Sequence, residues 1–291
     1  MKLRFLLRYA GVCFSSLMSI LVSHSAHAKV PDMKGMAKTS KKVRSAQSQP
    51  AGEEGVSSSP VNELKNPQDT GQDRYPWKKE IVTTTFWIGE KAAQNNPVPN
   101  RKSSWDPRWA ENYGGTDSPS QADRTKEFIP AKFVPRQNPF YIALPYNDKM
   151  KGGHKPEAER VIPWFKQAYQ GAEASVCKGR WIAIRRGNRT CYAQWEDAGP
   201  FRTDHWEYVF GNARPLPNLN RGAGLDVSPA VRDFLGMNDT DVTDWKFVDF
   251  EEVPAGPWAR YGDNNTFVIN RRTAEEQVAG LDSRKKETTT E

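Results

Sequence analysis

The sequence predicts a mainly β domain that contains only a few short helices. Segments rich in β-branched and aromatic residues, which favour extended strands, recur along the central part of the chain. Turn-forming residues separate these segments, and helical spacing is confined to two short stretches. The segments that we expect to form strands are residues 81–88, 140–144, 180–184, 190–195, 225–227 and 245–250.

The best-specified pair of strands is a β-hairpin. Residues 180–184 and 190–195 flank the dipeptide Gly187-Asn188. Both of these residues readily adopt the positive φ angles that a tight hairpin turn requires. A turn centred there places Cys191 opposite residue 184 or a close neighbour.

The first and last strands frame a long connecting segment. Residues 81–88 (IVTTTFWI) end at Gly89, and residues 245–250 begin an alternation of apolar and polar side chains. Residues 91–138 are rich in proline and glycine and predict a loop. A loop of this length in a compact domain usually serves a function or acts as a lid.

The first helical stretch covers residues 157–170, and it contains Pro163. Proline removes a backbone donor and clashes with the preceding turn, so we expect it to kink or split this helix.

The second helical stretch has a clear start and end. Ser228 is a favourable N-cap, and Pro229 suits the first helical position. Residues 230–235 then predict a short helix, and Gly236 is the expected terminating residue. Asp226 therefore lies where a strand leads into a helix N-terminus.

Residues 1–28 have the three-part pattern of a cleavable signal peptide. Basic residues precede an apolar run over residues 9–22, and Ala26-His27-Ala28 supplies small residues at the cleavage positions. An uncleaved membrane anchor is the alternative, but the run is shorter than the about 20 residues that a span requires. Cys13 follows a valine, so we expect no lipid attachment. The sequence predicts a periplasmic or extracellular protein without a stable membrane anchor after cleavage.

The chain downstream of the signal peptide has three parts. Residues 29–74 contain no aromatic residue and predict a disordered spacer, because they cannot bury enough apolar surface to offset chain entropy. Residues 75–262 hold all ten tryptophans and predict one folded domain. Residues 263–291 are expected to be a mostly flexible extension, frayed and polar from residue 272.

Charge and cysteine content exclude some functions. The net charge of +7 falls to +4 once the three basic residues of the signal peptide are removed, and so small an excess does not indicate nucleic acid. Cys177 and Cys191 are the remaining cysteines, and export favours a disulfide between them, with two free buried thiols as the alternative. They and His154 and His205 lack the spacing of a metal site, so we expect neither metal nor cofactor.

Three motifs carry a resemblance to a known group. They are EDAGPF at residues 196–201, GLDVSPAV at 224–231 and LGM at 235–237. In this order they resemble double-psi β-barrel proteins of the rare-lipoprotein-A-like, expansin-like and small endoglucanase group. Residues 83–89 and 143–148 are similar to earlier parts of that barrel. The resemblance implies a six-stranded double-psi β-barrel, here with inserted short helices and long loops.

The same resemblance implies an exported protein that acts on cell-wall polysaccharide. Relatives include lytic transglycosylases of peptidoglycan, small endoglucanases, and wall-loosening proteins without clear hydrolytic activity. This chain departs from the group by lacking a lipid-anchor cysteine, by a helical insertion between Asp148 and Cys177, and by an insertion over residues 203–222. These insertions could reshape the groove, so the substrate does not transfer from the group.

Four acidic residues are the candidate catalytic groups, because cleaving a glycosidic bond requires a proton donor and usually a second carboxylate. Asp226 and Asp197 match the aspartates of the group's motifs, and Glu90 follows the first strand, where endoglucanase relatives have an acid. Asp148 lies in a Tyr-Asn-Asp turn. Each has a structural alternative as a helix cap, turn residue or solvated strand end. A helix N-terminus would lower the pKa of Asp226, which opposes a general-acid role unless burial raises it.

Four aromatic residues are the candidate sugar-binding groups. Trp105, Trp109, Tyr113 and Trp206 lie in loop-like segments and could stack on sugar rings. The leading hypothesis is a monomeric enzyme that cleaves a wall glycan as a lytic transglycosylase or glycoside hydrolase. The alternatives are a non-catalytic polysaccharide-binding protein on the same barrel and a structural envelope protein whose spacer reaches a partner.

Overall fold

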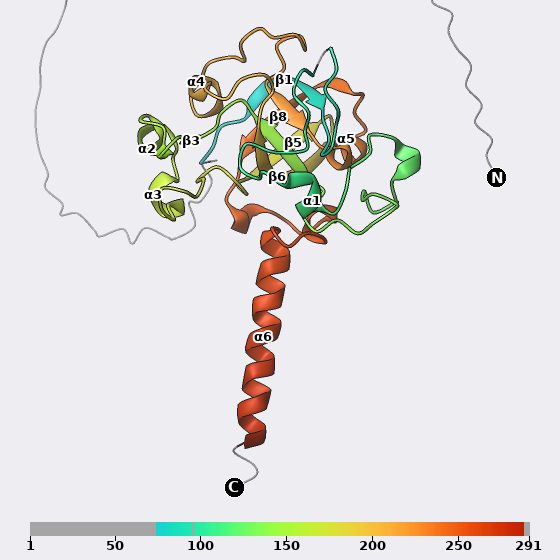
Figure 1. Ribbon diagram of the computed structural model, residues 1–291, viewed down its shortest axis with the longest axis vertical. Coiled ribbons are helices and arrows are strands. Elements are labelled where there is room, and N and C mark those ends of the chain that lie inside the picture. Colours follow the sequence, from blue (N-terminus) through green and yellow to red (C-terminus); the bar gives the residue numbers. More distant parts are fainter. Residues whose placement is uncertain (1–73, 95, 288–291) are drawn as a thin grey trace, which may run out of the picture. The chain divides into compact units, whose positions relative to one another are not determined.

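The computed structural model describes residues 74–94 and 96–287, which form a mainly β structure built on a closed six-stranded barrel (Figure 1). The signal peptide and the spacer lie outside the described residues. The barrel strands are β1 (Lys78–Thr85), β2 (Tyr141–Leu144), β5 (Trp181–Arg186), β6 (Arg189–Ala198), β7 (Leu225–Val227) and β8 (Thr240–Phe247).

Around the barrel the strands follow the order β1-β7-β2-β6-β5-β8. The pairs β1–β7 and β2–β6 are parallel and the others antiparallel, so the barrel is mixed. This arrangement confirms the predicted fold class and is compatible with a double-psi barrel. Large side chains from every side fill the interior, among them Trp195, Trp245 and Ile142, all fully buried.

The hairpin prediction is confirmed. Strands β5 and β6 pair with Ile184 opposite Cys191, and Gly187 in the turn has a φ of 57°. The disulfide prediction is wrong, because Cys177 and Cys191 are free thiols in this structure. Cys191 faces Ile184 across the hairpin, whereas Cys177 lies before β5 and near Asp148. Burial raises the pKa of both thiols.

Both helix predictions are confirmed. Pro163 divides the first stretch into α2 (Ala158–Val161) and α3 (Phe165–Ala168), which lie beside the small hairpin of β3 (Lys149–Met150) and β4 (Gly153–His154) (Figure 1). The second stretch is α5 (Pro229–Leu235). The Ser228 Oγ accepts a hydrogen bond from the Val231 amide, and Gly236 ends the helix with a φ of 67°.

The loop over residues 91–138 folds into a second small core. It includes α1 (Trp109–Tyr113) and a 3₁₀ turn, Gln121–Asp123. Residues 86–88, which we expected to extend the first strand, lie outside β1, and Phe86 and Ile88 pack into this core instead. Its buried members are Phe86, Ile88, Trp109, Ala110, Tyr113, Tyr141 and Ala143.

The C-terminal part differs from the expected flexible extension. It forms a long helix, α6 (Thr266–Glu287), whose first turn packs on the domain through Phe267 against Trp181 and Phe250. Residues 269–279 are exposed. Two 3₁₀ turns, Phe250–Glu252 and Pro257–Ala259, and the short helix α4 (Trp206–Val209) complete the fold. No helix within the described residues is both long and apolar enough to cross a membrane.

Candidate functional site

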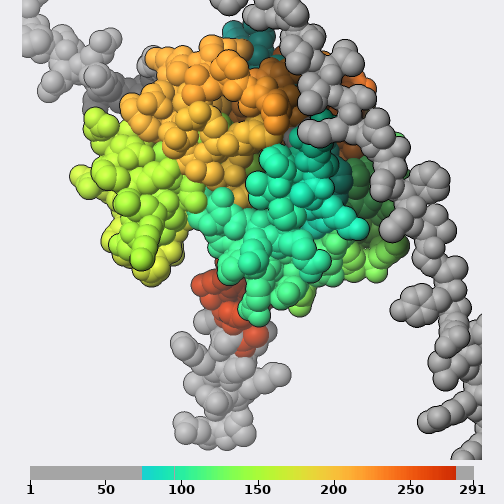
Figure 2. All heavy atoms as spheres, turned by 45° about the horizontal axis from the view of Figure 1, so that its top comes forward, coloured from blue at the N-terminus to red at the C-terminus, as the bar shows by residue number. Residues whose placement is uncertain are grey.

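A groove of about 780 Å³ opens where the first strand ends and the turn after β6 begins. Strands β1 and β7 contribute its inner wall, and residues 96–104 and 197–203 contribute its rims. Figure 2 shows these two rims, teal and orange, meeting on one face of the molecule. The groove brings together Glu90, Asp197 and Asp226, three of the four predicted catalytic residues.

Asp226 is the central carboxylate of this group. It lies on β7, between Thr84 of β1 and Ala143 of β2 in the barrel register. The Thr84 hydroxyl donates a hydrogen bond to the Asp226 Oδ1. Burial raises the pKa of Asp226 to about 7, and the negative charges of Glu90 and Asp197 act in the same direction. Because Ser228 caps α5, Asp226 does not serve as its cap.

Asp197 lies near the end of β6, facing the rim of residues 101–104. One of its oxygens, Oδ1, accepts hydrogen bonds of 2.7 Å from the amides of Ser104 and Ala198. Such bonds stabilise the ionised form, but burial outweighs them and raises the pKa of Asp197 to about 6. Asp197 therefore holds Ser104 in the rim formed by residues 96–104, and it also offers a carboxyl group to the groove.

Glu90 follows the first strand and begins the loop that forms one rim. Its carboxylate accepts a hydrogen bond of 2.9 Å from the Asn100 side chain, and its carbonyl accepts one from the Asn100 amide. Burial raises the pKa of Glu90 above its ordinary value. The three carboxyl groups thus come from segments distant in sequence, and burial raises the pKa of each.

Asp148 does not line the groove, and its contacts assign it a structural role. Its side chain is fully buried and accepts hydrogen bonds from the Ser175 hydroxyl at 2.5 Å and the Val176 amide at 2.8 Å. His154 Nδ1 lies 3.1 Å from its Oδ2. Asp148 therefore holds the helical insertion against the barrel.

The prediction of a sugar-stacking role is wrong for two of the four aromatic residues. Trp109 is 1% exposed and Tyr113 is fully buried, because both rings pack around Tyr141 in the second core. The loop position of these residues misled the prediction, since the loop carries its own core. A ring without an exposed face cannot contact a polysaccharide.

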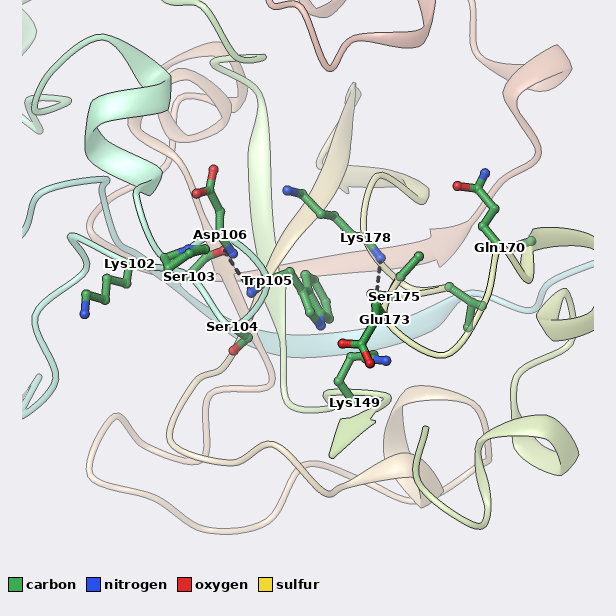
Figure 3. A pocket seen from close by; sticks show the side chains of 14 residues that line it. Lys102, Ser103, Ser104, Trp105, Asp106, Lys149, Gln170, Glu173, Ser175 and Lys178 are labelled. Carbon is green, nitrogen blue, oxygen red and sulfur yellow. Dashed lines mark hydrogen bonds between the residues drawn. The ribbon is translucent and has the colours of Figure 1, made fainter. Parts of the chain in front are cut away.

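The other two aromatic candidates lie outside the groove. Trp206 starts α4 and packs under the Arg160 guanidinium. Trp105 packs edge-on against Trp195 and donates its indole N–H to the Asn147 side chain at 2.8 Å. It lines a second pocket of about 690 Å³, where Figure 3 shows it between the 102–104 segment and Ser175.

The two pockets are neighbours because Lys102, Ser103 and Ser104 line both. The sequence prediction missed that the pockets are adjacent, which depends on the fold of the long loop. It also missed Thr84, the donor to Asp226, and Phe201, which lies on the groove's rim. The run of three threonines at 83–85 gave no signal as to which hydroxyl faces the groove.

Glu196 is a further acidic residue that the sequence prediction did not single out. It is 2% exposed, and burial raises its pKa to about 7. The Asn264 amide donates to its Oε1 at 3.0 Å, while its Oε2 has no hydrogen-bond partner among the described residues. Glu196 does not line the groove, so we assign it no contact with a ligand.

Among the described residues, no group of three or more histidine, cysteine or acidic side chains has the geometry to hold a metal ion. Comparison with protein-family models gives no match for this chain. Comparison with curated proteins gives no match either. The geometry of the groove and the motifs around it are therefore the basis for a functional assignment.

Proposed function

We propose that this protein is an exported enzyme that cleaves glycosidic bonds in a cell-wall polysaccharide such as peptidoglycan. The observation that carries the proposal is the cluster of Glu90, Asp197 and Asp226 in one groove, with the pKa of Asp226 raised to about 7. A carboxyl group with a pKa near 7 keeps its proton in about half of the molecules at pH 7 and can donate it to a leaving oxygen.

In this scheme Asp226 is the general acid that protonates the glycosidic oxygen. Asp197, with a pKa of about 6, is ionised at neutral pH and stabilises the positive charge that develops at the anomeric carbon. Two products are consistent with this chemistry. After Asp226 has given up its proton, its carboxylate accepts the proton that the attacking group releases. Attack by water gives a hydrolase, whereas attack by a hydroxyl of the same sugar gives an anhydro sugar and a lytic transglycosylase.

The motifs around the cluster favour a wall glycan as the substrate. EDAGPF and GLDVSPAV, which contain Asp197 and Asp226, resemble the rare-lipoprotein-A-like and expansin-like group. The signal-peptide pattern over residues 1–28 would deliver the chain to the compartment that holds such polymers. An open groove with a second pocket on the other side of residues 102–104 suits an extended chain better than a small molecule.

The test is to incubate the purified full-length chain with peptidoglycan sacculi and with soluble glucans, and to analyse released saccharides by mass spectrometry. We expect release by the parent chain and a loss of at least about 100-fold in Asp226→Asn, which keeps the shape but removes the acid. A product that has gained one water indicates hydrolysis, whereas an anhydro product indicates transglycosylation.

Asp263→Asn is the matched control, because Asp263 is an exposed aspartate paired with Arg272 and does not line the groove. Its activity should equal that of the parent. If the parent and Asp226→Asn release nothing but both bind sacculi, the enzymatic proposal is wrong and the alternative of a polysaccharide-binding protein holds.

A further inference from the structure

Phe201 is a large apolar side chain held open to solvent at the groove. It lies in the turn after β6, is 40% exposed and lines the same groove as Asp197 and Asp226. Within the described residues it makes no contact with another aromatic ring. Val98, which is 65% exposed, lines this groove as well. The groove therefore combines a carboxylate wall with apolar side chains on its rims.

The backbone of Phe201 is also strained, with a φ of 60°. This left-handed region disfavours residues that carry a Cβ, and such outliers persist where the surrounding structure holds them. Phe128 gives a direct comparison, because it has nearly the same φ of 62°. The Phe128 ring is partly buried and packs against Phe140 and Phe234, so this packing accounts for its conformation. No comparable packing accounts for Phe201.

We propose that Phe201 is a sugar-binding platform in this groove, on which a pyranose ring stacks beside the catalytic carboxyl groups. The inference rests on the proposed function and names the class of substrate more closely. An aromatic face offers its π-electrons to C–H groups. A pyranose whose substituents are all equatorial, as in β-linked glucose or N-acetylglucosamine polymers, presents a face of axial C–H groups that fits such a ring.

This role explains why the turn retains an exposed phenylalanine in a conformation that glycine adopts without strain. Binding sites typically combine apolar or aromatic surfaces with a few polar groups that fix orientation. Here Phe201 would supply the apolar contact, while Asp226 would supply the proton.

The experiment measures binding of chitohexaose and cellohexaose to the full-length Asp226→Asn chain by isothermal titration calorimetry. The Asp226→Asn substitution prevents cleavage of the hexasaccharide, so the measurement reports binding alone. We expect binding of at least one hexasaccharide. Adding Phe201→Ala or Phe201→Gly should weaken that binding by tenfold or more, whereas Phe201→Trp should retain it.

The two glycine variants separate a binding role from a structural one. Phe201→Gly relieves the strain and loses no contact with another aromatic ring, so its Tm should stay within about 3 °C of the parent or rise. Phe128→Gly relieves the same strain but loses core contacts, so its Tm should fall while the folded protein keeps its affinity for the hexasaccharide.

Either of two results would overturn the inference: unchanged affinity in Phe201→Gly, or binding of neither hexasaccharide by the parent background. A fall in the Tm of Phe201→Gly as large as that of Phe128→Gly would also overturn it, since it would assign the ring to folding. If hexasaccharide binding depends on Phe201 but the parent chain cleaves no glycan, the platform stands and the proposed enzymatic function fails.

Discussion

Two opposing electrostatic effects act on Asp226. It precedes the N-terminus of α5, where the helix dipole would lower the pKa of a carboxyl group. Ser228 takes the capping position, however, and Asp226 lies in the groove between two strands. Burial and the nearby charges of Asp197 and Glu90 dominate, so the pKa rises to about 7. Burial thus outweighs the helix dipole, a balance that the sequence left open.

The hydrogen bond from Thr84 gives a way to test this assignment. It stabilises the ionised form of Asp226 and lowers its pKa, in opposition to burial. Removing it in Thr84→Val should raise the pKa. If Asp226 is the general acid, kcat/KM falls as pH rises above about 7 in the parent. In the variant this falling limb should move to higher pH, by about 0.5 to 1 pH unit.

Thr85→Val is the matched control for this pH profile. Thr85 is the neighbouring residue and also lines the groove, but its buried hydroxyl has no hydrogen-bond partner among the described residues. Its replacement should leave the position of the limb unchanged. A limb that stays fixed in Thr84→Val, or that moves to lower pH, would show that another group provides the proton.

At the scale of elements, the long loop over residues 91–138 is held by a buried ion pair. The Arg124 guanidinium donates to Asp117 and lies 3.3 Å from the Asp233 carboxylate on α5. Asp117 also accepts a hydrogen bond from the Tyr141 hydroxyl on β2. The loop is thereby attached to both the barrel and the helix that follows β7, and its rim over the groove depends on that attachment.

We expect Arg124→Met to destabilise the protein by about 3 to 5 kcal/mol, because it leaves the Asp117 carboxylate buried without its cation. Urea unfolding followed by tryptophan fluorescence measures this loss. Arg260→Met is the control, since Arg260 forms an exposed pair with Glu127 and its loss should cost less than about 1 kcal/mol. Equal costs in the two variants would contradict the role given to the buried pair.

Elements set by local chemistry could be predicted from the sequence. The hairpin follows from the conformations open to Gly187 and Asn188, the split helix from Pro163, and α5 from its cap at Ser228. Helix α6 was missed because its residues 269–279 are exposed all round and so lack an apolar stripe. Pattern analysis cannot detect such a helix.

Contacts between distant segments could not be predicted. The Thr84–Asp226 hydrogen bond joins residues separated by 142 positions, and the Ser104–Asp197 bond joins residues 93 apart. The motif resemblance and the strand end identified Asp197, Asp226 and Glu90, which do share a groove. The sequence could not show that Trp109 is buried, because a Trp in a loop has the same local sequence pattern whether it is buried or exposed.

At the scale of the whole molecule, the fold contains ionisable groups whose burial disfavours their charged forms. Burial raises the pKa values of Asp226 and Glu196 to about 7 and of Asp197 to about 6. Burial lowers the pKa of Lys78, whose amine donates to the Gly211 carbonyl, to about 8. Each shift is a difference in proton affinity between the folded and unfolded states, so stability must depend on pH.

These shifts predict that stability falls as the pH rises from 4.5 toward 8. Between pH 4.5 and 7 the folded state binds more protons than the unfolded state at Asp226, Glu196 and Asp197, so the free energy of unfolding falls as pH rises. Between about pH 8 and 9 the unfolded state binds the extra proton at Lys78, which raises the free energy of unfolding. Above about pH 9 the raised pKa values of the buried Cys177 and Cys191 thiols lower it, because the folded state then binds more protons. Urea unfolding measured at intervals from pH 4.5 to pH 10 would trace these changes.

Single variants identify the residues responsible for each part of the dependence of the free energy of unfolding on pH. One pKa unit corresponds to about 1.4 kcal/mol, so we expect the acid-side fall to amount to several kcal/mol even after the solvent exposure of the groove is allowed for. Glu196→Gln should flatten that limb without altering the groove, and Asp226→Asn should flatten it further. Lys78→Met should remove the rise between about pH 8 and 9. A free energy of unfolding that increases steadily from pH 4.5 to 7.5 would contradict the raised pKa values, and with them the neutral Asp226 on which the proposed proton donation depends.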